Sequence, residues 1–202
     1  MKKQMVFVGV IMIVLIVGSS AFGQIGLNGV FGGIAYYSPE DVDATLAFGG
    51  GVNLGEVAPK VGLEADLTYW KKGWDESGYG YKVDLSLSQI VISALARYKL
   101  NQSDAKFQFE AGGGLGIAST KAKSEVSSDY DDMFIKASSP LVAMAHSDSE
   151  TETGLVIHLS ALARTKVSDK MEGVGEFRYS LGGDNHGDNL AIWVKVNYLL
   201  NR

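Results

Sequence analysis

The sequence contains no cysteine and only three prolines among its 202 residues. Without cysteine the chain forms neither a disulfide framework nor a thiolate metal site, so an exported protein of this kind needs a large core, a closed sheet or a membrane for its stability. Long apolar runs are also missing after residue 23. The most apolar stretch there, residues 90–96, is far shorter than the roughly 20 residues of a membrane-spanning helix.

The first 23 residues have the order of a secretory signal peptide. Lys2 and Lys3 precede an apolar run of thirteen residues, 5–17, and the small residues after it end in Ala21-Phe22-Gly23, a small-x-small cleavage site. The run is too short for the alternative, a membrane anchor. We therefore expect a signal peptide over residues 1–23 and an exported domain over residues 24–202.

The expected exported domain is acidic. It holds 16 basic and 23 acidic residues, a net charge of −7. Two of the 18 basic residues of the whole chain, Lys2 and Lys3, belong to the expected signal peptide. Proteins that bind nucleic acid present a basic face, so we expect no nucleic-acid partner. A length of 179 residues is that of one domain.

Alternation of apolar and polar residues predicts β-strands along nearly the whole domain. In residues 62–69, Leu63 and Leu67 alternate with Glu64 and Asp66. Segments of this kind occupy eight stretches: 25–37, 45–54, 62–69, 81–100, 107–117, 155–164, 176–181 and 190–200. In the fourth, the apolar residues change parity near Gln89, which predicts a β-bulge there.

The connections between these segments differ in length. Tight connections are expected at residues 56–60, 101–105 and 166–170, and longer or more polar ones at 71–80, 119–151 and 182–188. Short turns on one rim and long loops on the other are typical of an outer-membrane barrel whose N-terminus lies in the periplasm. The loop 119–151 is predicted either to extend its two strands above the membrane or to cap the barrel mouth.

Alternation alone fits two opposite barrels, a soluble lipocalin-like carrier with an apolar interior and a membrane barrel with a polar one. Charges of both signs, mixed with glycine and serine, share the polar parity, as the narrow interior of an eight-stranded barrel requires. Closure also removes unpaired strand edges, which hydrocarbon does not tolerate. The predicted interior polar network is Glu64, Asp66, Asp84, Arg97, Glu110, His158, Ser160, Arg164, Glu176, Arg178 and Lys195.

Aromatic residues on the apolar parity gather at the segment ends. Tyr69 and Tyr179 lie toward the expected long-loop rim, and Tyr98, Phe107 and Tyr198 toward the short-turn rim. Two aromatic girdles around an aliphatic band are typical of a barrel that crosses a bilayer. This favours the membrane barrel over the soluble carrier.

With its signal peptide, eight alternating segments, loop asymmetry and final amphipathic strand, the chain resembles the small eight-stranded outer-membrane barrels of Gram-negative bacteria, of the OmpA/OmpX type in the porin family. The resemblance implies an all-β, antiparallel, up-and-down transmembrane barrel in the outer membrane, without a cofactor. It implies outer-membrane lipid and lipopolysaccharide as surroundings and the barrel-assembly machinery as a partner during insertion. A structural or surface-interaction role is expected, with a narrow porin as the alternative.

A lipid-modifying enzyme is a further alternative. His158 and Ser160, with Glu172 further along, resemble the spacing of outer-membrane lipid A deacylases, although Ala161 stands where that family has asparagine. Pairing about a turn centred near Ser168 predicts Glu176 opposite Ser160 and Arg178 opposite His158. We therefore expect an interior polar network at these positions and no enzyme.

The predicted loops are acidic. Residues 38–43, 119–152, 182–189 and 71–82 carry net charges of −3, −4, −2 and +1, a total of −8, which is expected to face outward from the cell. Such a field is expected to recruit divalent cations or a cationic partner, and the alternative is that acidic loops simply stay soluble and repel one another. The stretches 129–132 and 184–188 have the oxygen-rich composition of cation-binding loops but not EF-hand spacing, and ordinary turns share that composition.

Overall fold

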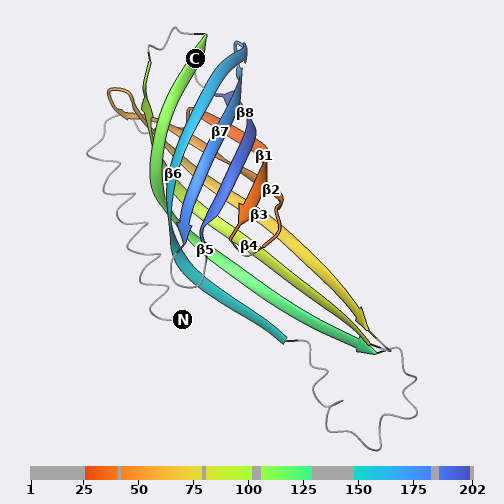
Figure 1. Cartoon of the computed structure of the whole chain (residues 1–202). Helices are drawn as coiled ribbons and strands as arrows, with labels where there is room; N and C mark the ends of the chain where they lie inside the picture. Colours follow the sequence, from red (N-terminus) through yellow and green to blue (C-terminus); the bar gives the residue numbers. More distant parts are fainter. Residues whose placement is uncertain are drawn as a thin grey trace, which may run out of the picture.

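Eight antiparallel strands form a closed barrel in the computed structural model (Figure 1). The structure describes residues 26–40, 42–78, 81–101, 106–128, 148–182 and 187–200. The strands are β1 (Gly29–Pro39), β2 (Thr45–Ala58), β3 (Val61–Gly78), β4 (Tyr81–Lys99), β5 (Phe107–Ser128), β6 (Asp148–Ser168), β7 (Met171–Gly182) and β8 (Asn189–Leu199). Each pairs with its neighbours in the chain, and β1 pairs with β8 to complete the ring. The predicted fold is thus confirmed, whereas the predicted signal peptide, residues 1–23, lies outside the described residues.

The barrel has two different rims. At the turn rim, residues 59–60 connect β2 to β3 and residues 169–170 connect β6 to β7. Leu200 N donates a hydrogen bond to Asn28 O, so both ends of the described chain also lie at this rim. At the extended rim, β3 to β6 continue well beyond the other four strands (Figure 1). Within the described ranges, no helix is long and apolar enough to cross a membrane.

Strand structure continues into two of the predicted loops. β3 and β4 pair as far as Gly78 and Tyr81, and β5 and β6 pair as far as Ser124 and Asp148. The prediction of a loop was therefore wrong for residues 71–78, whereas residues 119–128 and 148–151 continue β5 and β6. These extensions lack a continuous apolar face, so alternation does not reveal them. Of the two alternatives for the long connection, the described part fits extension of the strands, while residues 129–147 lie outside the described residues.

The β-bulge predicted near Gln89 is also wrong, because β4 pairs one to one with β3 and β5 along its whole length. The apolar parity changes for another reason. Leu87 lies on the inner parity and packs on buried aromatic residues, whereas Ile90 faces outward. Register shifts occur instead in β2 next to Gly55, whose φ of +84° suits glycine, and in β6 after Lys166.

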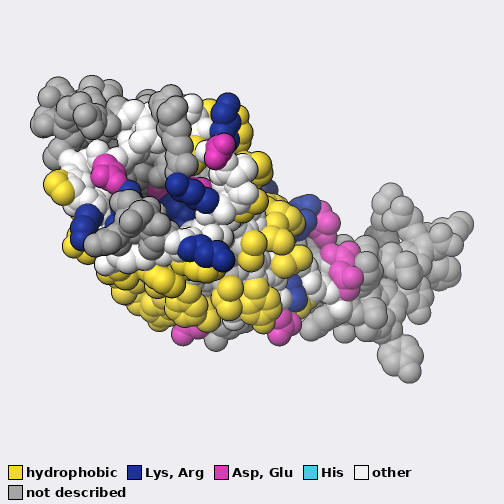
Figure 2. Space-filling view, turned by 90° about the horizontal axis from the view of Figure 1, so that it is seen from above, with side chains coloured by type: hydrophobic (Ala, Val, Ile, Leu, Met, Phe, Trp, Pro, Cys, Tyr) yellow, Lys and Arg dark blue, Asp and Glu magenta, His cyan; other side chains and the backbone are white. Residues whose placement is uncertain are grey.

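Apolar and charged side chains occupy opposite faces of the wall. Leu67, Ile92 and Val194 are 48%, 62% and 66% exposed on the outside, whereas Glu64 and Asp66 are buried inside. Hydrophobic side chains gather along the outer wall in the view from above (Figure 2). A lipocalin-like carrier would have the reverse arrangement, so the structure excludes that alternative.

Glycine makes room for the large side chains that fill the interior. A β-carbon on Gly49 would lie 2.7 Å from the Trp193 ring, and one on Gly116 would lie 2.8 Å from His158 Nε2. The space inside an eight-stranded barrel is only wide enough for side chains. The glycines on the inner parity therefore belong to the packing of the lumen.

Candidate functional site

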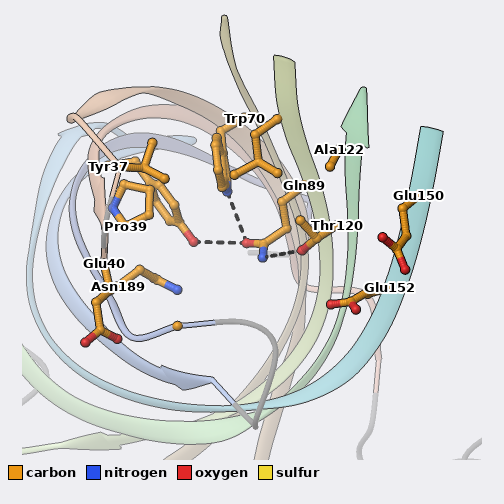
Figure 3. A pocket seen from close by; sticks show the side chains of 13 residues that line it. Tyr37, Pro39, Glu40, Trp70, Gln89, Thr120, Ala122, Glu150, Glu152 and Asn189 are labelled. Atoms are coloured by element: carbon orange, nitrogen blue, oxygen red, sulfur yellow. Dashed lines mark hydrogen bonds between the residues drawn. The ribbon is translucent and has the colours of Figure 1, made fainter. Parts of the chain in front are cut away.

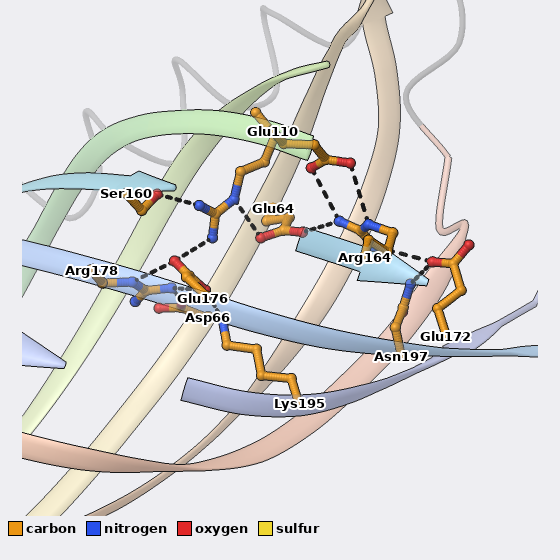
Figure 4. A network of polar contacts seen from close by, with 11 residues as sticks. Glu64, Asp66, Glu110, Ser160, Arg164, Glu172, Glu176, Arg178, Lys195 and Asn197 are labelled. Carbon is orange, nitrogen blue, oxygen red and sulfur yellow. Dashed lines mark hydrogen bonds and ion pairs between the residues drawn. The ribbon is translucent and has the colours of Figure 1, made fainter. Parts of the chain in front are cut away.

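A buried ion-pair network fills the half of the lumen nearer the turn rim (Figure 4). We use this name for nine charged residues: Glu64, Asp66, Arg97, Glu110, Arg164, Glu172, Glu176, Arg178 and Lys195. All nine are buried, and they come from β3 to β8. Five acids face four bases, so the network is nearly neutral.

Glu64 joins two arginines at the centre of the network. Its Oε2 lies 2.8 Å from Arg97 Nε, and its Oε1 lies 3.2 Å from Arg164 Nη2. Arg164 also pairs with Glu110 and Glu172, each at 3.3 Å. These five residues stand on five different strands, β3 to β7, so their contacts tie the strands together through the lumen as well as along the wall.

Glu176 continues the network from Arg97. Its Oε1 accepts from Arg97 Nη2 at 2.9 Å and from Arg178 Nε at 3.0 Å, and its Oε2 accepts from Lys195. Arg178 reaches Asp66 Oδ2 at 2.6 Å. Buried charges cost several kcal/mol each to desolvate, so a fully paired arrangement is needed to keep all of them inside.

An aromatic layer closes the lumen above this network, toward the extended rim. It consists of Tyr37, Trp70 and Trp193 packed with Ala35, Ala47 and Ala191. Lys195 and Arg178 lie against the Trp193 ring, at 5.2 Å and 5.8 Å from its centroid, so the two layers are in contact.

Gln89 binds the aromatic layer on the side that faces the extended rim. Its Oε1 accepts hydrogen bonds from Trp70 Nε1 at 3.0 Å and Tyr37 Oη at 3.2 Å, while its Nε2 donates to Thr120 Oγ1 at 2.9 Å. The amide thus links β1, β3, β4 and β5 across the mouth.

Two larger cavities open at the ends of the barrel. The mouth cavity at the extended rim has a volume of about 370 Å³, and the vestibule at the turn rim has about 540 Å³. Between them lie two voids of about 10 Å³ each, beside Lys195 and beside His158. One water needs roughly 10–15 Å³, so these voids do not join the two cavities into a path for hydrated ions.

The residues of the hypothetical deacylase site do not come together. His158 Nε2 lies 3.0 Å from Ser93 Oγ and its Nδ1 lies 2.9 Å from Ser180 Oγ. Ser160 instead accepts a hydrogen bond from Arg97. Glu172 pairs with Arg164 and accepts from Asn197 Nδ2 at 3.0 Å, near the turn rim. A serine nucleophile needs its base within hydrogen-bond reach. Among the described residues, His158 is hydrogen-bonded to Ser93 and Ser180 and not to Ser160.

The predicted pairing of β6 with β7 was wrong by two residues. Ser160 stands opposite Arg178 and His158 opposite Ser180, because the turn is formed by residues 169–170 and β6 carries a register shift after Lys166. The prediction assumed a symmetric turn about Ser168 and therefore missed both the true position of the turn and the register shift.

Asp84 is the predicted interior residue that the structure places elsewhere. It lies on the extended part of β4, opposite Asp75 and Glu125, and shares the outer parity of Ile90 and Ile92. The mistaken bulge at Gln89 had assigned it to the inside. The other predicted interior residues lie within the lumen: Glu64, Asp66, Arg97, Glu110, His158, Ser160, Arg164, Glu176, Arg178 and Lys195.

The predicted girdle residues all lie on the outer wall. Tyr69, Tyr98, Phe107, Tyr179 and Tyr198 are between 37% and 48% exposed. Tyr98, Phe107 and Tyr198 stand within two residues of strand ends at the turn rim, whereas Tyr179 approaches the other rim. Their contact with the two membrane interfaces stays a prediction.

The sequence contains an indication of the aromatic layer that the alternation of apolar and polar residues alone does not reveal. Trp70 and Trp193 stand on the polar parity of their segments, next to Thr68 and Lys195. A bulky aromatic residue at such a position indicates a lumen filled by side chains.

The structure describes only part of the predicted cation-binding loops. Residues 129–132 and 184–186 lie outside the described residues. Asp188 is described, and its carboxylate accepts hydrogen bonds from Tyr179 Oη and Gly182 N. Within the described ranges, no group of three or more His, Cys, Asp or Glu side chains is placed to hold one metal ion.

Comparison with known proteins agrees with this architecture. The family model described as outer membrane protein beta-barrel domain matches residues 12–198. No curated protein matches the chain significantly.

Solved structures similar to the whole barrel include the following two. A major outer membrane protein from Thermus thermophilus superimposes with a TM-score of 0.60 at 9% identity, covering 85% of this chain and 98% of that one. Ail, the attachment invasion locus protein of Yersinia pestis, solved with the heparin analogue sucrose octasulfate, gives a TM-score of 0.54 at 16% identity, covering 87% and 98%. At these identities the likeness concerns the fold.

Proposed function

The chain belongs to the family of outer membrane protein β-barrel domains, and we propose that it is a closed barrel that exposes its extended rim at the cell surface. Its localisation is the outer membrane. The proposed role is structural or one of surface interaction rather than transport. The observation that carries this proposal is the filled lumen, in which the ion-pair network and the aromatic layer lie in series.

The first rival is a narrow porin, which needs a continuous aqueous path. Salt bridges that cross the lumen from β3 to β6 and β7, such as Glu64–Arg164, would have to open for water to pass. Above them, Trp70 and Tyr37 would have to leave Gln89. Both rearrangements leave buried charged or polar groups unpaired, which supports the closed state.

The extended rim is proposed to face outward from the cell. Two-residue turns at the opposite rim, such as 59–60 and 169–170, are typical of the periplasmic side of bacterial barrels. The extended rim carries the acidic residues Glu40, Glu150 and Glu152. Lipopolysaccharide and lipid are the proposed surroundings of the outer wall, the barrel-assembly machinery is the proposed partner during insertion, and divalent cations remain proposed partners of the acidic loops.

We further propose that the protein is not a lipid-modifying enzyme. Support comes from His158, which lies between Ser93 and Ser180, and from Ser160, which is held by Arg97. These contacts give both side chains a part in lumen packing.

The absence of cysteine allows a direct test of surface display. Single variants Lys123→Cys, on the extension of β5, and Lys170→Cys, in the turn between β6 and β7, place one thiol at each rim. A membrane-impermeant maleimide added to intact cells should label Lys123→Cys and not Lys170→Cys.

After the outer membrane is permeabilised, both variants should be labelled, which controls for reactivity. Labelling of Lys170→Cys alone on intact cells would reverse the proposed orientation. Labelling of neither variant on intact cells would contradict exposure of the extended rim.

A further inference from the structure

The mouth cavity has the features of a binding site for an organic cation. It lies on the aromatic layer and is lined by carboxylates above it (Figure 3). We infer that it binds an alkylammonium ligand of the diamine or polyamine class. The inference goes beyond the proposed function and shares with it only the closed lumen, which makes the cavity a pocket with a floor rather than the entrance of a pore.

Three carboxylates give the cavity a single sign of charge. Glu40 follows β1, and Glu150 and Glu152 stand on the inner parity of β6. Figure 3 shows Glu40 on one side of the mouth and the other two glutamates across from it. Among the described residues that line the cavity there is no Lys, Arg or His. A cleft with charge of one sign over a low-dielectric wall concentrates ions of the opposite sign.

Asn189 supplies an independent indication of a ligand. Its side chain lines the cavity and is 7% exposed. Its Oδ1 is buried and accepts no hydrogen bond from any group in the described part of the chain. A buried acceptor without a donor costs about 1–3 kcal/mol, and an N–H group of a bound ammonium would relieve this cost.

The side chains of Tyr37, Trp70 and Gln89 form the floor of the cavity. Trp70 Nε1 and Tyr37 Oη both donate their hydrogens to Gln89, so the hydroxyl oxygen of Tyr37 keeps its lone pairs for a further donor. The rings of Tyr37 and Trp70 lie 5.4 Å apart, centroid to centroid. Aromatic faces attract ammonium groups, and more strongly where water is excluded.

The spread of the charges distinguishes an alkylammonium from a metal ion. A calcium ion needs six to eight oxygens at about 2.3–2.6 Å, yet no described cluster of three acidic or histidine side chains meets the requirements of a metal site. A ligand with two or more ammonium groups joined by methylenes can reach separate carboxylates and cover the aromatic floor. A volume of about 370 Å³ falls in the range of roughly 300–1,000 Å³ found for small-molecule pockets.

Spermidine titrated by calorimetry into the folded protein in non-ionic micelles tests this inference. The double variant Glu150→Gln/Glu152→Gln should bind spermidine at least ~10-fold more weakly, because each hydrogen bond to a charged group contributes more than a neutral one. Glu125→Gln is the matched control, since Glu125 is exposed on β5, pairs with Lys123 and does not line the cavity. Its affinity should match that of the unmodified protein.

Asn189→Ala separates binding from folding. The lost oxygen has no partner in the described structure, so the variant should fold normally by heat-modifiable migration and still bind spermidine more weakly. Magnesium ions should compete poorly with spermidine at equal charge concentration.

Three results would overturn the inference: no binding of spermidine at millimolar concentration, an equal loss of affinity in Glu125→Gln and in the double variant, or full competition by magnesium. The second would assign binding to the diffuse acidic rim. Binding in micelles depends on neither the orientation of the barrel in the membrane nor its conductance. These three results would therefore not contradict the proposed closed barrel. Conversely, a conducting protein that binds spermidine would contradict only the closed barrel.

Discussion

Arg164 and Glu64 pair across the lumen, with Nη2 of the arginine 3.2 Å from Oε1 of the glutamate. They stand on β6 and β3, which are not neighbours in the sheet and lie 100 residues apart in the chain. The wall hydrogen bonds hold each strand to the next, whereas this pair holds opposite sides of the barrel together. The lumen therefore contributes to the closure of the barrel as well as to its filling.

Loss of the Arg164 charge should destabilise the barrel strongly. Arg164→Met removes one ion-pair partner from each of Glu64, Glu110 and Glu172 while preserving most of the side-chain volume. Breaking buried ion pairs by removing one partner costs about 3–5 kcal/mol. Urea titration of the protein folded in lipid vesicles measures the change in the free energy of unfolding.

The exposed pair Lys123–Glu125 provides the control for that experiment. Glu125→Gln should cost no more than about 1 kcal/mol, as is usual for surface pairs. Equal losses for Arg164→Met and Glu125→Gln would show that the interior charges are solvated and that the network is not closed.

A methyl group added at Gly116 should disturb the packing around His158. The new β-carbon would lie 2.8 Å from His158 Nε2 and 2.9 Å from Ser93 Oγ. Overpacking of this kind costs about 1–3 kcal/mol. Gly175→Ala is the matched control, because nothing lies within 4 Å of its β-carbon position, and it should be neutral or slightly stabilising. The midpoint of urea unfolding is measured for both variants. Equal midpoints would contradict the close packing of His158 and Ser93 around Gly116.

A charged residue introduced on the outer wall should lower the free energy of unfolding strongly only within the apolar band. Leu67→Arg and Val194→Arg should lose about 2–4 kcal/mol of folding free energy in vesicles, as charges near the bilayer midplane do. Val167→Arg, near the turn between β6 and β7, should lose about 0–1 kcal/mol because it lies near an interface. A uniform cost at the three positions would contradict the placement of the membrane band.

Purified protein should not release acyl chains from lipid A, and Ser160→Ala should leave the lipid A mass spectrum unchanged. Ser160 accepts a hydrogen bond from Arg97 and has no contact with His158 among the described hydrogen bonds. Acyl release by the unmodified protein that disappears in Ser160→Ala would establish the enzymatic alternative instead.

Sequence patterning predicts the fold and the faces well where one side of a strand meets an apolar environment. Leu67 and Glu64 were assigned to the correct faces because their segment alternates without interruption. The prediction failed in the extensions of β3, β5 and β6, where residues such as Lys71 and Lys121 meet solvent and no apolar face marks the strand. It failed at Gln89 because Leu87 packs inward on the aromatic layer.

Pairing inside the lumen is less accessible to sequence. Parity places Arg97, Arg164 and Glu64 on the inner face, but their partners depend on the stagger of strands around the ring. The position of the turn at residues 169–170 and the register shift in β6 together place Arg178 opposite Ser160. The mouth cavity combines Glu40 with Glu150 and Glu152, which are distant in the chain, so only the closed barrel brings them together.

The most direct test of the closed lumen is single-channel recording of the purified, refolded protein in planar lipid bilayers. The ion-pair network and the aromatic layer predict a flat current trace, without stable steps, over a range of voltages and salt concentrations. Insertion is verified in the same preparation by protease protection of the barrel in vesicles. A reproducible unitary conductance from inserted protein would contradict the closed lumen and assign the protein to the narrow porins.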